Sequence, residues 1–224
     1  YGMDIRPQIA GRPTGILHGL TSNFHVFLAS PTWREKLANL SVEDRVAAMK
    51  TPEIRAALLS EPSPLITAAI GDGQAGDLAA AFGGSLLWRI FPLGEKPDYE
   101  PDREGSVAGL AEAGGVTPLE MMYDLLVRED GRELFYQPLG GYVTYNFDFF
   151  RKNMQHPNVL FGLSDGGAHC GVIADAGMPT FILTHWARDR TKGELCPLEG
   201  LVRKLTRDTA MADGMSDRGE LKPG

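Results

Sequence analysis

The stretch that decides the fold is Asn158-Val-Leu-Phe-Gly-Leu-Ser-Asp-Gly-Gly-Ala-His-Cys-Gly171. Residues 159–163 form a short, nearly continuous apolar run, which is typical of a buried parallel strand. The run ends abruptly at Ser164-Asp165. An aspartate in this position would present its carboxylate at the carboxyl end of the strand, where α/β barrels and open α/β sheets build their active sites.

The residues that follow Asp165 also suit an active site. Gly166 and Gly167 carry no side chains and would let a substrate or a metal ion approach the backbone closely. We expect His169 either to contact substrate or orient the aspartate, or else to be a hydrogen-bonded loop residue. A strand followed by Asp-Gly-Gly also occurs as an ordinary tight turn, so the spacing alone leaves the active site and the turn equally open.

Elsewhere the chain mixes helix and strand patterns, which predicts an α/β protein. Residues 3–10 show partial alternation of apolar and polar side chains and predict a strand, which a loop at residues 11–15 follows. Further strands are expected at residues 86–91 and 133–137. Helix starts are expected at Ser30-Pro31, Ser41 to Asp44, Thr51-Pro52-Glu53 and Thr117-Pro-Leu-Glu120, and helices also at 148–154, 180–188 and 197–206.

The composition excludes several classes of protein. The chain has 224 residues and a formal net charge of −7, and its basic residues are scattered, which disfavours both nucleic-acid binding and a polybasic membrane surface. No apolar run approaches the roughly 20 residues that a membrane span requires. The two cysteines, Cys170 and Cys196, cannot make a disulfide framework, and reduced thiols favour a cytoplasmic location.

Three segments resemble the amidohydrolase superfamily, in the branch that contains D-aminoacylases and N-acyl-D-aspartate or N-acyl-D-glutamate deacylases. Residues 158–171 resemble the last barrel strand of that family. Asp4-Ile-Arg-Pro-Gln-Ile-Ala-Gly-Arg-Pro13 is similar to the preceding barrel strand. Pro197-Leu-Glu-Gly-Leu-Val-Arg-Lys-Leu-Thr206 and Ser216-Asp-Arg-Gly-Glu-Leu-Lys-Pro-Gly224 are similar to the helix that follows and to the entry into a small β domain.

The resemblance implies a TIM-like barrel, of which residues 1–212 would be the C-terminal portion. Residues of about 29–145 would be a large, mostly helical insertion, and residues 213–224 the start of the small β domain beside the barrel. Both ends of the chain look cut, so the expected partner is the missing N-terminal part of the same chain. A complete barrel has about eight strands and this chain offers two convincing ones, so we expect the fragment alone to be inactive.

The resemblance also implies a chemistry. In that family a zinc-bound water attacks the carbonyl of a non-peptide amide, and the aspartate after the last strand passes a proton to the leaving nitrogen. Asp165 matches that aspartate and is expected to be the proton shuttle and a metal contact, with a small N-acyl amino acid or related amide as substrate. The chain contains no HxH pair, so most zinc ligands are expected upstream.

Two arginines and a glutamine lie around the end of the first expected strand, where relatives hold the carboxylate of the substrate. Arginine suits this task because it pairs with a carboxylate through two hydrogen bonds. Surface arginines that flank a turn are the alternative interpretation. The expected substrate-binding residues are Arg6, Gln8, Arg12, Gly166, Gly167 and His169.

Two other functions stay open at this point. The protein could hydrolyse a cyclic amide, as hydantoinases and dihydropyrimidinases do, or it could be a non-catalytic helical interaction domain in which residues 164–169 are a structural turn. Burial of Asp165 away from any cleft would remove the main support for an enzyme. The other histidines lack metal-ligand spacing and are expected to be structural or at the surface: His18, His25, His156 and His185.

Overall fold

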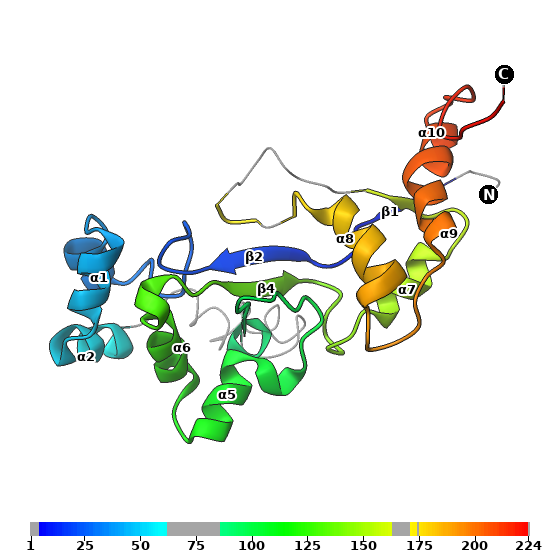
Figure 1. Cartoon of the computed structure of the whole chain (residues 1–224). Coiled ribbons are helices and arrows are strands. Elements are labelled where there is room, and N and C mark those ends of the chain that lie inside the picture. Colours follow the sequence, from blue (N-terminus) through cyan, green and yellow to red (C-terminus); the bar gives the residue numbers. More distant parts are fainter. Residues whose placement is uncertain (1–4, 62–85, 163–170, 174, 224) are drawn as a thin grey trace. The chain divides into compact units, whose positions relative to one another are not determined.

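The structure is a computed structural model that describes residues 5–61, 86–162, 171–173 and 175–223. It mixes helices with β-sheet, as the sequence predicts for an α/β protein (Figure 1). The described chain divides into two compact units. Unit 1 takes its residues from 1–14, 146–170 and 174–224, and unit 2 takes its residues from 15–145 and 171–173.

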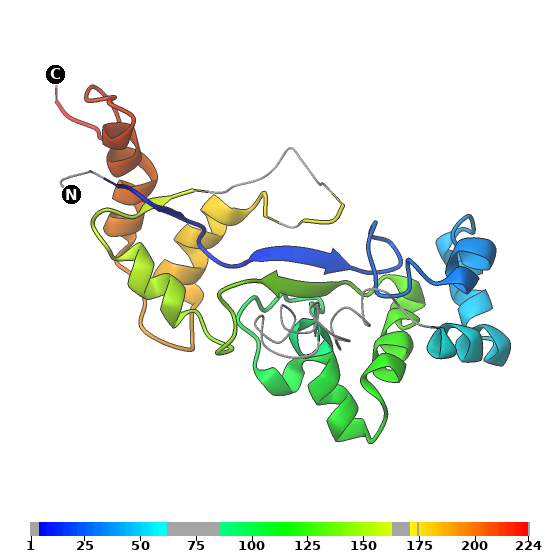
Figure 2. The same cartoon turned by 180° about the vertical axis from the view of Figure 1, so that it is seen from behind.

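Unit 1 is built on a pair of parallel strands that come from distant parts of the chain. Strand β1 (Gln8–Ile9) lies beside β5 (Leu160–Phe161), with Gln8 opposite Leu160 and Ile9 opposite Phe161 (Figures 1 and 2). The other elements of unit 1 are α7 (Asp148–Met154), α8 (Met178–Thr184), η5 (His185–Asp189), α9 (Leu198–Arg203), η6 (Lys204–Asp208) and α10 (Thr209–Ala212).

Unit 2 has a three-stranded sheet in the order β2-β4-β3, in which β3 and β4 are antiparallel. Its strands are β2 (Thr14–His18), β3 (Phe91–Pro92) and β4 (Phe135–Leu139). Its helices are η1 (Trp33–Leu37), α1 (Val42–Met49), α2 (Pro52–Ser60), η2 (Leu86–Arg89), η3 (Arg103–Gly105), α5 (Val107–Gly114), α6 (Pro118–Leu126) and η4 (Glu129–Gly131). The buried core of this unit includes Phe27, Leu37, Met49, Leu58, Ile90, Val107, Met122, Leu126 and Phe135.

The helices begin where the sequence predicts them, because their first backbone N–H groups find side-chain acceptors. The Ser41 side chain accepts a hydrogen bond from the N–H of Asp44, and the Thr51 side chain accepts one from Ile54. Thr117 and Glu120 form a complete capping box at the start of α6. Such caps satisfy donors that the helix itself leaves unpaired, so local sequence is enough to place these helix starts.

Two strand expectations and one loop expectation need correction. Residues 86–91 do not form one strand: Leu86–Arg89 is a 3-10 helix and only Phe91–Pro92 is a strand. A short apolar run has the same appearance in a buried helical turn as in a strand, so periodicity could not separate them. The loop expected at residues 11–15 ends early because β2 begins at Thr14. Of the strand expected at residues 3–10, only Gln8–Ile9 is a strand, the other described residues are irregular, and residues 3 and 4 lie outside the described part.

None of the described helices combines the length and the apolar character that crossing a membrane would require. Residues 213–223 form turns and irregular structure after α10. The small β domain expected from residue 213 onward therefore stays a prediction.

The capping box of α6 gives a test of how local sequence stabilises unit 2. Thr117→Ala removes the acceptor for the N–H of Glu120 and should lower the free energy of unfolding by about 1 kcal/mol, measured by urea denaturation. Thr206→Ala is the matched control, because its hydroxyl donates to the carbonyl of Val202 inside a helix and caps nothing. Equal losses in the two variants would contradict a capping role for Thr117.

Candidate functional site

The parallel strand pair of unit 1 is the base of the candidate site. The N–H of Leu160 donates to the carbonyl of Pro7 over 3.0 Å, and the N–H of Gly162 donates to the carbonyl of Ile9 over 3.1 Å. The resemblance to two successive barrel strands predicts that these segments are parallel neighbours, and this pairing is confirmed. Parallel strands end at the same edge of a sheet, so the segments after Ile9 and after Phe161 leave from one edge, which we call the carboxyl edge.

Gln8 reaches toward this carboxyl edge from β1. Its side chain lies so close to Gly162 that a Cβ atom on the glycine would be 2.4 Å from Gln8 Oε1 and 2.9 Å from Gln8 Cβ. No side chain fits at residue 162 without displacing the glutamine. The Gln8 side chain is exposed and lies over the backbone of Gly162. Gly162 is three positions before Asp165 in the sequence.

Arg12 follows β1 on the same edge, and it is buried. Its Nη1 donates to Oδ1 of Asp175 over 2.8 Å, and both side chains are almost fully buried, at 2% and 0% exposure. The guanidinium also lies over the ring of Phe181, 5.4 Å from its centroid. A carboxylate of the chain itself therefore occupies the pairing position that a substrate carboxylate would need.

The backbone next to Arg12 is fixed as tightly as its side chain. The indole Nε1 of Trp186 donates to the carbonyl of Gly11 over 2.7 Å. A Cβ atom at residue 11 would lie 2.3 Å from Cγ1 of Ile182 in α8, so only glycine fits between the strand and this helix. The segment Gly11-Arg12 is therefore held by contacts with α8, η5 and Asp175.

Arg6 lies at the other end of β1. It precedes the strand and lines a hollow beside α9 and η6, together with Pro157, which precedes β5. We call this end of the strand pair the amino edge. Of the three expected substrate contacts in this segment, the structure thus brings Gln8 and Arg12 to one edge and leaves Arg6 at the opposite one.

The expected catalytic residue and its neighbours lie outside the described residues: Asp165, Gly166, Gly167 and His169. Their roles stay predictions. Within the part of the chain that the structure describes, no three or more His, Cys, Asp or Glu side chains are grouped so that they could hold a metal ion. The described residues alone therefore do not form the expected zinc site, and Asp165 as a metal contact stays a prediction.

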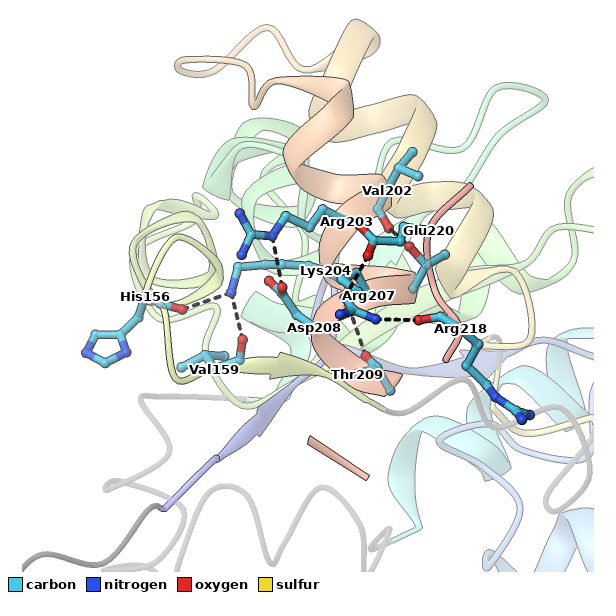
Figure 3. Close-up of polar contacts among 11 residues, drawn as sticks. His156, Val159, Val202, Arg203, Lys204, Arg207, Asp208, Thr209, Arg218 and Glu220 are labelled. Atoms are coloured by element: carbon cyan, nitrogen blue, oxygen red, sulfur yellow. Dashed lines mark hydrogen bonds and ion pairs between the residues drawn. The ribbon is translucent and has the colours of Figure 1, made fainter. Parts of the chain in front are cut away.

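Two residues that the sequence did not single out support this strand pair. Asp175 is the partner of Arg12, 163 positions away in the sequence. Lys204 Nζ donates to the carbonyls of His156 and Val159, over 2.9 and 2.8 Å, just before β5 (Figure 3). Burial lowers the pKa of Lys204. Neither residue belongs to a local motif, so no signal in a single sequence could have identified them.

Unit 2 contains two buried histidines whose ring nitrogens are only partly satisfied. Nε2 of His18 lies 2.7 Å from Oε1 of Gln137, and Nδ1 of His25 accepts from the N–H of Phe27. The other ring nitrogens, Nδ1 of His18 and Nε2 of His25, are buried and have no hydrogen-bond partner among the described residues. Burial lowers the pKa of His18 to about 4, and burial together with the charge of Arg45 lowers that of His25 to about 3. Both imidazoles are therefore buried and neutral at pH 7, and their purely structural role stays a prediction.

Comparisons with protein-family models, with curated proteins and with solved structures found no match for this chain.

The Arg12–Asp175 pair should be a structural element of unit 1. Arg12→Met or Asp175→Leu alone leaves a buried, unpaired charge and should cost about 3–5 kcal/mol of unfolding free energy, whereas the double variant should recover most of the loss. Urea denaturation measures all three variants. Arg188→Met is the control, because Arg188 forms an exposed pair with Asp189 that solvent screens, and its removal should change the unfolding free energy little. Single variants as stable as the control would contradict this assignment.

Acid should destabilise unit 2 through its buried histidines. Their folded pKa values of about 4 and 3 lie below the unfolded value of 6.5, so unfolding takes up protons and stability falls as the pH drops below 6.5. Each histidine contributes a slope of up to about 1.4 kcal/mol per pH unit. Urea denaturation between pH 7 and 5 should show a shallower slope for His18→Asn than for the exposed control His156→Asn. Equal slopes for the two variants would show that His18 does not contribute to the loss of stability in acid.

Proposed function

We propose that this chain belongs to a hydrolase of a non-peptide amide C–N bond that deacylates N-acyl-D-amino acids, with Asp165 as proton shuttle. The parallel pairing of β1 with β5 is the observation that supports it. In the sequence Asp165 lies three positions after Gly162 and four after Phe161, the last residue of the strand that pairs with β1. A carboxylate after a parallel strand is a common position for catalytic groups in α/β folds.

The proposal includes a barrel of the TIM type, to which β1 and β5 would contribute neighbouring strands. The pair has the parallel orientation that such a barrel requires. The apolar side chains of Val159, Leu160 and Phe161 are buried, as expected of a strand in the interior of a sheet. The remaining strands, and zinc ligands other than Asp165, would have to come from residues outside the described part.

Asp165 would carry out the proton transfer of this reaction. One of its carboxylate oxygens would take a proton from the attacking water while the C–N bond is still intact. The same oxygen would then give the proton to the leaving nitrogen, so that the amine departs neutral as the bond breaks. A carboxylate close to both atoms is suited to this task because it is a base in one step and an acid in the next.

Gln8 and Arg12 would have different roles in this enzyme. The exposed Gln8 amide lies over Gly162 and could donate and accept hydrogen bonds with a polar substrate. The charge of Arg12 is balanced by Asp175, so we assign Arg12 to positioning the segment after β1 rather than to binding a substrate carboxylate. Arg6 lies at the amino edge and has no part in this proposal.

Asp165→Asn in the complete enzyme tests the proposal. Asparagine keeps the shape and removes the proton acceptor, so kcat for N-acetyl-D-amino acids should fall by about 10²–10⁴-fold with a smaller change in KM. Zinc content is measured on the same sample. Asp189→Asn is the matched control, because Asp189 is exposed and paired with Arg188, and its activity should stay near wild type.

Two results would overturn the proposal. A fully active, zinc-replete Asp165→Asn enzyme would remove the mechanism and favour a structural turn, where asparagine is well tolerated. A wild-type enzyme that hydrolyses a hydantoin or a dihydropyrimidine but no N-acyl-D-amino acid would replace the substrate class with cyclic amides.

A further inference from the structure

The outer face of α9 carries apolar side chains that remain half exposed. Leu201 is buried on the inner face of this helix, which packs against α8 and η5. On the outer face Leu198 and Val202, one helical turn apart, are 50% and 42% exposed. Thr206 follows one turn later in η6, and its hydroxyl donates to the carbonyl of Val202 over 2.8 Å, which leaves its methyl group toward the surface. Leu198, Val202 and Thr206 line one open groove, which we call the α9 face.

The charges that line the α9 face cancel. They are two glutamates, Glu199 and Glu220, and two arginines, Arg203 and Arg207. Arg207 and Glu220 pair with each other, with 3.5 Å between Nε and Oε1 (Figure 3). The formal net charge of the chain is −7, so two copies repel each other in general. A face without net charge is where two copies can approach with the least repulsion.

Glu199 and Arg203 keep pairing capacity for a partner. They are four positions apart, so both lie on the same flank of the apolar stripe. In the described part of the chain, the Glu199 carboxylate takes part in no ion pair. Arg203, 72% exposed, donates through Nε to Oδ1 of Asp208 over 2.9 Å, and its two terminal nitrogens remain for another acceptor.

A second copy that packs antiparallel on the α9 face would satisfy both groups. With Val202 at a twofold axis, Val202 packs on its own counterpart, and Leu198 packs on Thr206 of the second copy. The same flanks of two antiparallel helices face each other, so Glu199 faces Arg203 of the second copy, and the symmetry forms this ion pair twice. In a parallel pair this flank would face the opposite flank, and the two charges would stay unpaired.

We propose that the α9 face binds a second copy of this chain, through a twofold-symmetric antiparallel pair of helices. A contact made by one helix from each copy is smaller than the roughly 1,200 Å² that stable interfaces bury. The dimer should therefore be weak, with a dissociation constant of about 10–500 μM. None of the residues involved belongs to the proposed catalytic site, so this inference is independent of the hydrolase function.

Sedimentation velocity of the chain over a concentration range that spans this dissociation constant tests the pairing. The wild type should change from monomer to dimer as the concentration rises. Val202→Glu places two like charges at the twofold axis and should raise the dissociation constant at least about tenfold. Val143→Glu is the matched control and should dimerise as the wild type does, because Val143 is a 57% exposed valine of unit 2 that does not line the α9 face.

A charge exchange tests the antiparallel arrangement. Glu199→Arg sets like charges opposite each other in both symmetry-related pairs and should raise the dissociation constant at least about tenfold. The double variant Glu199→Arg/Arg203→Glu restores opposite charges across the interface and should return the dissociation constant to within about threefold of the wild-type value. Circular dichroism of each variant confirms that it is folded.

Four results would overturn the proposal. A wild-type chain that stays monomeric over the whole range would leave the α9 face to another kind of partner. A dimer that Val202→Glu leaves intact would use a different face. Equal weakening by Val143→Glu and Val202→Glu would indicate unspecific association. A double variant that dimerises as weakly as Glu199→Arg would exclude the antiparallel pairing of the charges.

Discussion

The backbone pairing of β1 with β5 is the interaction on which unit 1 depends. Gln8 and Leu160 are opposite each other although 152 positions separate them in the sequence. The entropy lost by closing so long a loop must be offset by favourable contacts, and two strands of two residues each supply few of them. Other contacts must therefore converge on the same strands.

Those contacts flank the strand pair at both edges. At the carboxyl edge the Arg12–Asp175 pair and the Trp186–Gly11 hydrogen bond connect residues more than 160 positions apart. At the amino edge Lys204 connects η6 to the carbonyls that precede β5. Each of these contacts satisfies a polar group that would be costly to bury without a partner. The strand pair, the helices of unit 1 and the Arg12–Asp175 ion pair therefore stabilise one another. A buried ion pair adds little net stability compared with apolar packing. We therefore infer that the main effect of the Arg12–Asp175 pair is to hold the two segments that it joins in one arrangement.

Local sequence was sufficient to predict an element of the fold where the contact that stabilises this element is itself local. The caps of α1, α2 and α6 involve partners three residues apart, and all three were predictable. Strand β5 was also predictable, because a nearly continuous apolar run is typical of a buried parallel strand, whereas its pairing with β1 was implied by the resemblance to two successive barrel strands. By contrast, β2 was missed because Thr14 and Gly15 are typical of a turn, and only pairing with β4 makes the segment a strand. The role of Arg12 was not predictable, since its partner Asp175 is distant in sequence.

The two arginines around β1 show why residue type alone does not define a substrate site. Arg6 and Arg12 are six positions apart, yet they lie at opposite edges of the strand pair. To bind a substrate carboxylate, Arg12 would have to exchange Asp175 for it and leave a buried aspartate unpaired, at a cost comparable with the gain. An uncharged amide carries no such penalty. Gln8 is exposed and uncharged, and on the described carboxyl edge it is the side chain better suited to exchange water for a substrate. The proposed enzyme would then recognise its substrate at this edge through hydrogen bonds and would use the buried charges to hold the edge in shape.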